Sequence, residues 1–260
     1  MKSLEFLTSM VFANLVVHIE VNGDGFESTN EKEGAHFSII KGYQWVEVSI
    51  YPIEQMKGEG SVNRGENEAC DLRCDFHNKN RKREGIGKCY VRGDAVPRWQ
   101  AKALKALTLR RSEQVRHLRD KGYILRLTRW GDISRLNNEG LAYILRLISH
   151  SAETRAYSNI WRYEREYLAQ GDFERWAMLQ TLKSSCQASV SKVEDALEAA
   201  RLGWKVYAGA RQAEIRQALI NAGEKPVYRC PYDPQRKPAL RCSTCPVPCN
   251  GERHTLAPLV

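Results

Sequence analysis

The chain has 260 residues, of which 42% are hydrophobic and 27% are charged. This composition is ordinary for a folded globular protein and excludes a disordered or collagen-like chain, while the length suits one large domain or two small ones. An excess of 40 basic over 31 acidic residues gives a formal charge of +9, which favours an anionic partner, either nucleic acid or a phosphorylated ligand.

Residues 1–17 look superficially like a signal peptide. The apolar run is interrupted by Glu5, Thr8, Ser9 and Asn14, and no small-x-small cleavage site follows it. No stretch predicts a transmembrane helix. We therefore expect a cytoplasmic protein with no membrane partner.

The N-terminal part of the chain favours β-structure. Residues 11–22 alternate like a strand and end at the turn 22–25, and the β-branched and aromatic stretches 36–40 and 43–51 predict two more strands. Farther on, residues 95–120 carry apolar side chains at helical spacing, with lysines and arginines between them. This pattern predicts a long basic helix.

From residue 123 onward, strand-like and helix-like stretches alternate. The expected strands are 123–129, 154–161, 183–190, 204–209 and 226–229, and the expected helices are 137–150, about 173–179, 191–203 and 210–222. The third helix is predicted to open with a capping box, Ser191-Lys-Val-Glu194. The alternation predicts an α/β fold, a complete or partial (β/α) barrel with a cysteine-rich C-terminal metal loop; an open doubly wound sheet is the alternative.

This organisation divides the chain into three segments. Residues 1–68 are predicted to be an N-terminal β-rich segment that contributes to the barrel. Residues 69–229 are predicted to form the barrel-like core with a cysteine loop, and residues 230–260 a cysteine-rich metal-binding tail.

The carboxyl ends of the strands are where such folds place their chemistry. Arg129, Asp132 and Ser158 fall at predicted strand ends, so we expect them to line a catalytic pocket. The alternative for Asp132 is a cap or turn residue before the next helix. Cys186 stands apart from the other cysteines and is predicted to be a buried small hydrophobic residue.

Four cysteines near the C-terminus form the strongest motif in the chain. Cys230, Cys242, Cys245 and Cys249 follow the pattern C-x11-C-x2-C-x3-C, in a stretch rich in proline. A C-x2-C pair lets two thiolates of one turn reach a single metal ion, and the prolines hold the loop in shape. We expect zinc or an iron–sulfur cluster here, with two structural disulfides as the alternative.

A second group of cysteines, Cys70, Cys74 and Cys89, follows the predicted N-terminal strands. Three thiolates can hold three irons of a [4Fe–4S] cluster and leave the fourth iron open for a ligand. Together with His77, the same cysteines would instead form a Cys3His zinc site. The sequence leaves both readings open.

A basic insert separates Cys74 from Cys89, and the predicted basic helix follows. The positions that we expect to contact nucleic acid are Lys79, Arg81, Lys82, Arg83, Arg110 and Arg111. The alternative is that the insert is a solvated loop tip without a partner.

Several of these motifs together resemble a family of bacteriophage proteins, the gene-product-88-like family. They are the turn Cys89-Tyr90-Val91, the strand end Gly131-Asp132, the aromatic strand around Tyr157 and the closing cysteines that begin with Cys230-Pro231. The resemblance covers roughly residues 65–251, and the family is remotely similar to the radical S-adenosylmethionine barrel superfamily. It implies a barrel of the radical-enzyme type and a phage or prophage origin.

The cysteine spacing departs from that superfamily, whose members usually hold their cluster with C-x3-C-x2-C. Cys70 and Cys74 match the first pair, whereas fourteen residues separate Cys74 from Cys89. If the insert loops out, the three thiolates keep the geometry of the motif; otherwise the site holds zinc or no metal. Asp132 also stands where that superfamily often has a glutamate at the methionine-binding strand end.

Three functions remain open. The first is an iron–sulfur protein, in one form a radical enzyme that uses S-adenosylmethionine and acts on a nucleotide or nucleic acid. The second is a non-enzymatic, zinc-stabilised phage protein that binds host nucleic acid or a host protein complex. The third is a zinc-dependent nucleic-acid base-exchange enzyme, for which Asp132 is the candidate nucleophile.

Overall fold

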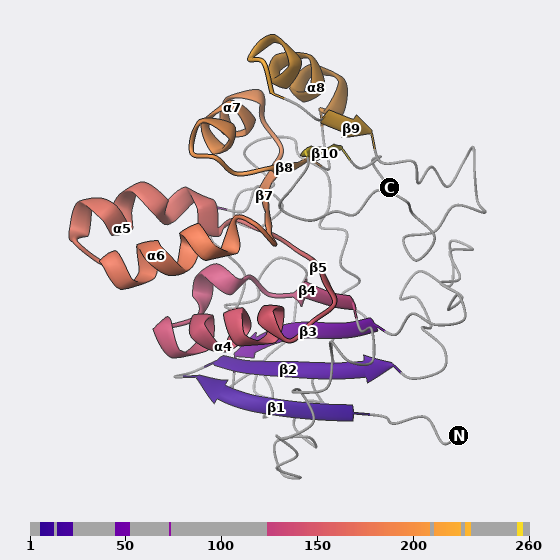
Figure 1. Ribbon diagram of the computed structural model, residues 1–260, viewed down its shortest axis with the longest axis vertical. Helices are drawn as coiled ribbons and strands as arrows, with labels where there is room; N and C mark the ends of the chain where they lie inside the picture. Colours follow the sequence, from indigo (N-terminus) through magenta and orange to yellow (C-terminus); the bar gives the residue numbers. More distant parts are fainter. Residues whose placement is uncertain are drawn as a thin grey trace.

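The computed structural model describes residues 6–12, 15–22, 45–52, 73, 124–208, 211–224, 227–229 and 254–256. Within them the strands form two five-stranded sheets, in the orders β1-β2-β3-β4-β5 and β6-β7-β8-β10-β9 (Figure 1). The strands are β1 (Phe6–Phe12), β2 (Leu15–Asn22), β3 (Trp45–Pro52), β4 (Ile124–Trp130), β5 (Glu153–Arg155), β6 (Tyr157–Ser158), β7 (Gln187–Val190), β8 (Val206–Ala208), β9 (Val227–Arg229) and β10 (His254–Leu256).

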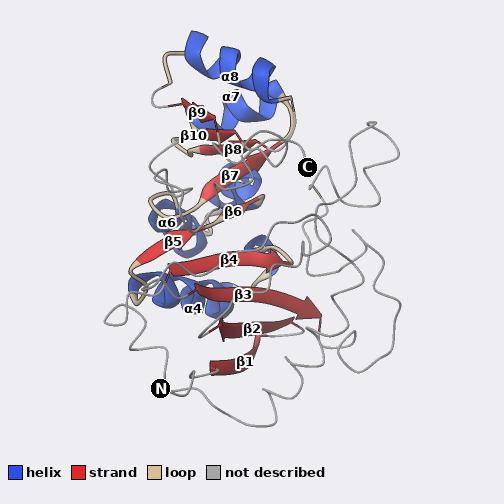
Figure 2. Ribbon diagram, turned by 90° about the vertical axis from the view of Figure 1, so that its right-hand side faces the viewer, coloured by secondary structure: helices blue, strands red, loops and turns tan. Residues whose placement is uncertain are grey.

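The two sheets meet in one extended stretch of chain. β5 pairs with β4, and β6 pairs with β7, so that only Ala156 separates the last strand of one sheet from the first strand of the other. The Gln187 amide donates a hydrogen bond of 2.8 Å to the Ala156 carbonyl across this junction. The strands therefore follow one another from β1 to β9 in a continuous stack (Figure 2).

The first three strands form an antiparallel meander, and all later neighbours within each sheet run parallel. The connecting helices are α4 (Asn138–Ser149), α5 (Glu164–Gln170), α6 (Phe173–Leu182), α7 (Val193–Arg201) and α8 (Gln212–Asn221), with short 3-10 helices η3 (Ile133–Arg135) and η4 (Ile160–Tyr163). From β4 to β9 each strand–helix–strand unit advances in the same direction along the stack. The helices α4 to α7 lie on one face of the sheets, as Figure 1 shows, which is the arrangement that crossovers of one hand produce.

The core lies between that face and the helices. Apolar strand residues with no exposed surface, such as Val48 and Val206, alternate along their strands with polar neighbours. Leu141 and Ile144 of α4 belong to the same buried cluster. Because successive strand residues face opposite sides, the other face carries polar side chains such as Glu153, Gln187 and Ser189, with Ile124 as a buried apolar residue among them.

The sequence correctly predicted the alternation of strands and helices, which is confirmed from β4 to β9. Residues 11–22, predicted as one strand, belong to two, β1 and β2, joined through residues 13–14. The predicted strand 154–161 contains β6 and part of β5, and then turns into η4. The predicted strand 36–40 and helix 95–120 lie outside the described residues.

Three further differences concern helix α7 and two short elements. The capping box at Ser191 was wrong, because α7 begins at Val193 with Lys192 at the cap position and no side-chain cap. Helix α5 and strand β10 were not predicted at all. β10 inserts between β8 and β9, parallel to both.

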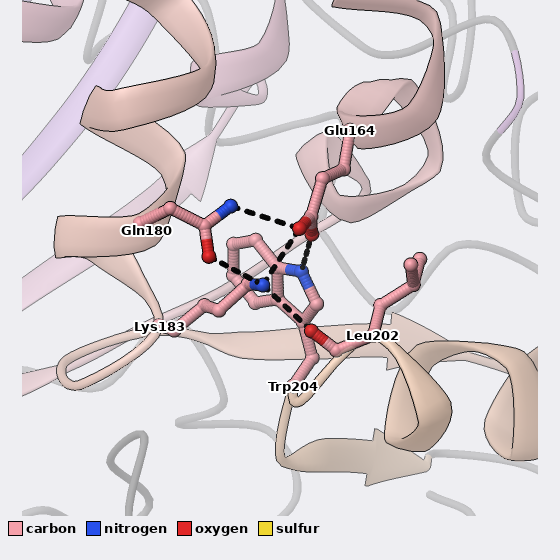
Figure 3. A network of polar contacts seen from close by, with 5 residues as sticks. All are labelled: Glu164, Gln180, Lys183, Leu202 and Trp204. Atoms are coloured by element: carbon pink, nitrogen blue, oxygen red, sulfur yellow. Dashed lines mark hydrogen bonds and ion pairs between the residues drawn. The ribbon is translucent and has the colours of Figure 1, made fainter. Parts of the chain in front are cut away.

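A buried carboxylate, Glu164, joins the helix layer at the start of α5 (Figure 3). One of its oxygens accepts hydrogen bonds from Gln180 at 2.8 Å and Lys183 at 2.7 Å, and the other accepts one from the Trp204 indole at 2.6 Å. The Lys183 ammonium also donates to the side chain of Gln180 and to the carbonyl of Leu202. The network therefore fixes α5, α6 and the end of α7 to one another.

We predict that Glu164→Ala lowers the free energy of unfolding by about 3 kcal/mol, because the Lys183 ammonium and the Trp204 indole lose their shared acceptor inside the protein. Urea denaturation measures this change. The matched control is Glu198→Ala, which removes an exposed ion pair with Arg165 and should change stability by no more than about 0.5 kcal/mol. Equal losses of unfolding free energy in the two variants would contradict the structural role assigned to Glu164.

The imidazole of His254 fixes β10 in place. Its Nδ1 accepts a hydrogen bond of 3.1 Å from the Val206 amide, so the proton resides on Nε2, which faces Glu224 at 3.0 Å. Lys205 lies 3.6 Å from the same carboxylate. Burial lowers the pKa of His254 below its ordinary value of 6.5, although the hydrogen bond to Glu224 opposes this shift.

This geometry gives stability a pH dependence. Since the folded protein keeps His254 neutral, the unfolded chain binds an extra proton as the pH falls through about 6.5, and stability falls with it. We predict that melting temperatures recorded between pH 7.5 and 5.5 decline more steeply for the unaltered protein than for His254→Asn. If the melting temperature of His254→Asn falls with pH as steeply as that of the unaltered protein, another group is responsible for the pH dependence.

Candidate functional site

The carboxylate of Asp132 lies where the two sheets meet, just beyond the end of β4. Its Oδ1 accepts hydrogen bonds from the Ser134 amide at 2.9 Å and the Ser158 hydroxyl at 2.5 Å, and its Oδ2 accepts one from the Asn159 amide at 3.0 Å. The Ser158 hydroxyl in turn accepts a bond of 3.0 Å from the Ile160 amide. Asp132 thus joins the carboxyl end of β4 to that of β6.

Local sequence explains how Asp132 reaches this position. Gly131 has φ +76°, a conformation that glycine adopts without strain, and it turns the chain out of β4. Asp132 then caps η3, as the turn-residue alternative predicted, while the same carboxylate also reaches β6. The structure therefore brings Asp132 and Ser158 together, and both are buried.

Of the three predicted pocket residues, Arg129 is placed less completely. Arg129 lies in β4, three residues before Asp132, and its side chain is not among those that the structure describes.

Cys186 is fully buried, as predicted, and its thiol donates to the Gln187 carbonyl at 3.6 Å. Burial, and after it the charge of Asp132, raises the pKa of Cys186 well above its ordinary value. Its thiol is therefore inert at neutral pH.

Arg73, which stands between Cys70 and Cys74 in the sequence, contacts the segment that follows β6. Its guanidinium donates to the Arg162 carbonyl at 3.2 Å and to the Glu166 carboxylate at 2.6 Å, and it lies 4.1 Å from the centre of the Tyr163 ring. The same segment includes Glu164, whose hydrogen bonds join it to Lys183 and Trp204. Arg73, which lies between the two cysteines in the sequence, is therefore anchored to the segment that follows β6.

The face of the sheet opposite the helices carries polar and aromatic side chains. On β6, β7 and β8 the register places Tyr157 beside Gln187 and Ser189 beside Tyr207. The rings of Tyr157 and Tyr207 stack with their centres 4.2 Å apart and their planes 8° apart. Gln187 is fully buried and donates a hydrogen bond of 3.0 Å to Thr255 of β10.

Sequence reasoning missed these residues, although a signal was present. Parallel strands covered on both faces by helices read as continuous apolar runs, whereas these strands alternate polar and apolar residues. Examples are Gln187-Ala-Ser-Val190 and Lys205-Val-Tyr-Ala208. The alternation marks a polar second face.

The other predicted site residues lie outside the described part of the chain. These are the cysteines Cys70, Cys74, Cys89, Cys230, Cys242, Cys245 and Cys249, His77, and the basic residues Lys79, Arg81, Lys82, Arg83, Arg110 and Arg111. Among the described residues, no group of three or more histidine, cysteine or acidic side chains is placed to hold a metal ion. In the same residues, no helix is long and apolar enough to cross a membrane.

Comparison with known proteins gives no match to a family model, to a curated protein or to a solved structure.

We predict that Asp132→Asn lowers the free energy of unfolding by about 2 kcal/mol, because an amide cannot accept from all three donors that the carboxylate serves. The matched control is Asp172→Asn at the start of α6, where Asp172 accepts only the Arg175 amide in its capping role. Asparagine caps helices as well as aspartate, so this control should be nearly neutral. Chemical denaturation compares the two, and similar losses would contradict a joining role for Asp132.

Proposed function

We propose that this chain is a phage-type iron–sulfur protein of the gene-product-88-like kind, in which Cys70, Cys74 and Cys89 hold a cluster. Cys230, Cys242, Cys245 and Cys249 hold an auxiliary cluster or zinc. In this proposal the protein is a radical-enzyme-like catalyst that uses S-adenosylmethionine in the host cytoplasm. Its substrate is a nucleotide or nucleic acid.

The observation that supports the proposal best is the anchoring of Arg73. Because Cys74 follows it directly and Cys70 precedes it by three residues, both are tied by short lengths of chain to the carboxyl edge of β6. That edge also carries Asp132 and Ser158. A cluster held by the cysteine motif would therefore lie near the end of the parallel sheet where α/β enzymes place their chemistry.

Two features of the sheet support a complete or partial barrel over a doubly wound sheet. A doubly wound sheet reverses its strand order at a switch point and carries helices on both faces. From β4 to β9 the helical crossovers advance in a single direction, with the helices on one face. The opposite face is polar, which suits the interior of a barrel that takes a polar ligand.

The C-terminal cysteines have a second tie to the sheet. β9 ends at Arg229 and the adjacent parallel strand β10 begins at His254, so residues 230–253 must return from the carboxyl end of β9 to the amino end of β10. Crossovers of this kind usually contain a helix, whose packing stabilises the connection. We infer that metal binding by the four cysteines stabilises this connection.

The hydrogen bonding of Asp132 favours the non-enzymatic alternative, a zinc-stabilised phage protein that binds host nucleic acid or a host protein complex. A carboxylate that accepts three hydrogen bonds is held in a structural role and is poorly suited to act as a nucleophile or base. The same argument weighs against the base-exchange enzyme. The metal identity separates these functions.

We predict that the full chain, purified without oxygen, contains iron and acid-labile sulfide and absorbs visible light. Arg73→Ala should lower the iron content, because the cysteine motif loses its anchor, whereas Arg165→Ala, which removes an exposed arginine of α5, should not. Metal analysis and visible spectra of the three proteins measure this. A colourless protein with zinc alone would support the alternative, and a protein without metal would contradict both.

A further inference from the structure

Two arginines and two tyrosines form a continuous row of contacts along helix α5. Tyr163 is the cap residue of the helix and Tyr167 stands one turn further on, so both rings lie on the same side of the helix. Their ring centres are 6.0 Å apart and their planes differ by 19°. The guanidinium of Arg73 lies 4.1 Å from the centre of the Tyr163 ring, and that of Arg175 lies 4.9 Å from the centre of the Tyr167 ring. We call this row, Arg73–Tyr163–Tyr167–Arg175, the α5 ladder.

One end of the ladder holds the turn that follows Asp132. Arg175 is 9% exposed, and its Nη2 donates to the carbonyls of Ser134 at 3.2 Å and Leu136 at 2.6 Å. Its Nη1 donates to the side chain of Asn138 at 3.0 Å. Because carbonyl dipoles and one aromatic face surround this buried cation, the Tyr167 ring and the η3 turn position it together.

The other end of the ladder is Arg73, whose charge is balanced by Glu166 at 2.6 Å. Its side chain is 41% exposed, and an exposed ion pair contributes little to stability by itself. The contact with Tyr163 adds to this pair and fixes the plane of the guanidinium. Tyr167 packs against Tyr163 and so limits the positions that the Tyr163 ring adopts. The position of Arg73 therefore depends on a ring that stands one step further along the ladder.

We propose that Tyr163, Tyr167 and Arg175 are positioning residues for Arg73, so that the η3 turn and the segment around Arg73 are energetically coupled through the α5 ladder. Contacts within one network are non-additive when they are removed together, whereas independent contacts add. The inference deepens the proposed function and rests on it for one consequence. A metal held by the cysteine motif on either side of Arg73 is retained more firmly when the ladder is intact.

Amide hydrogen exchange of the full, anaerobically purified protein tests the coupling, with mass spectrometry of peptides that contain residue 73. We expect Tyr167→Leu to lower the protection of these peptides about threefold or more, because the ladder loses a ring. Tyr167→Phe keeps the ring and should stay within about twofold. The matched control is Phe173→Leu on α6, whose ring is 64% exposed and lies outside the ladder, and it should leave the protection unchanged. Arg175→Lys, which keeps the charge without the planar group, should act as Tyr167→Leu does and replaces it if that variant does not fold.

A double variant separates coupling from a general loss of stability. In a background of Arg73→Ala, Tyr167→Leu should change the protection of the same peptides by less than about 1.5-fold, because the contact that the ladder supports is already lost. A challenge with a chelator follows the metal. Its removal should be about threefold faster in Tyr167→Leu and unchanged in Phe173→Leu.

Thermal melts confirm that each variant is folded. Unchanged protection around residue 73 in both Tyr167→Leu and Arg175→Lys overturns the inference even if the protein carries an iron–sulfur cluster. Effects of Tyr167→Leu and Arg73→Ala that simply add in the double variant overturn it as well. Coupled protection in a protein without metal supports the inference and contradicts the proposed function instead.

Discussion

The carboxylate of Asp132 accepts hydrogen bonds from Ser134, Ser158 and Asn159 at the place where the two sheets meet. A single stretch of chain, residues 153–158, serves as the last strand of one sheet and the first of the other, and it changes partners at Ala156. Each sheet pairs only part of that stretch. The hydrogen bonds that Asp132 accepts hold the carboxyl end of this stretch in register with β4. The strands and helices that follow β6 in the chain depend on that register for their position.

The same junction brings the chemically distinctive residues into one region. Arg73 contacts the segment that leaves β6, and the Glu164 network keeps that segment fixed against α6 and Trp204. On the polar face, Arg155 and Tyr157 flank Ala156. Arg73, which stands between Cys70 and Cys74 in the sequence, therefore lies close to the stretch that carries Arg155 and Tyr157, although it comes from a distant part of the chain.

The sequence predicted the elements whose signal is local. Helix α4 has an asparagine cap, Asn137, and a buried apolar stripe, and it was located within a residue at each end. Helix α5 was missed because its one buried residue is Glu164, which gives no apolar periodicity to detect. Strand β10 is three residues long, and its place depends on a contact between His254 and Val206, 48 residues apart. Arg73 meets Arg162 across 89 residues, a pairing that no local pattern encodes.

Anomalous X-ray diffraction from crystals of the anaerobically purified protein tests most directly whether a metal held by the cysteine motif lies at the carboxyl edge of the sheet. Cys70 and Cys74 are within three residues of Arg73, a reach of about 10 Å, so we predict a metal centre bound by both cysteines within about 20 Å of the Asp132 carboxylate. The polar face should be open toward it. A metal centre on the face covered by α4 to α8, or one that Cys70 and Cys74 do not bind, would contradict this arrangement.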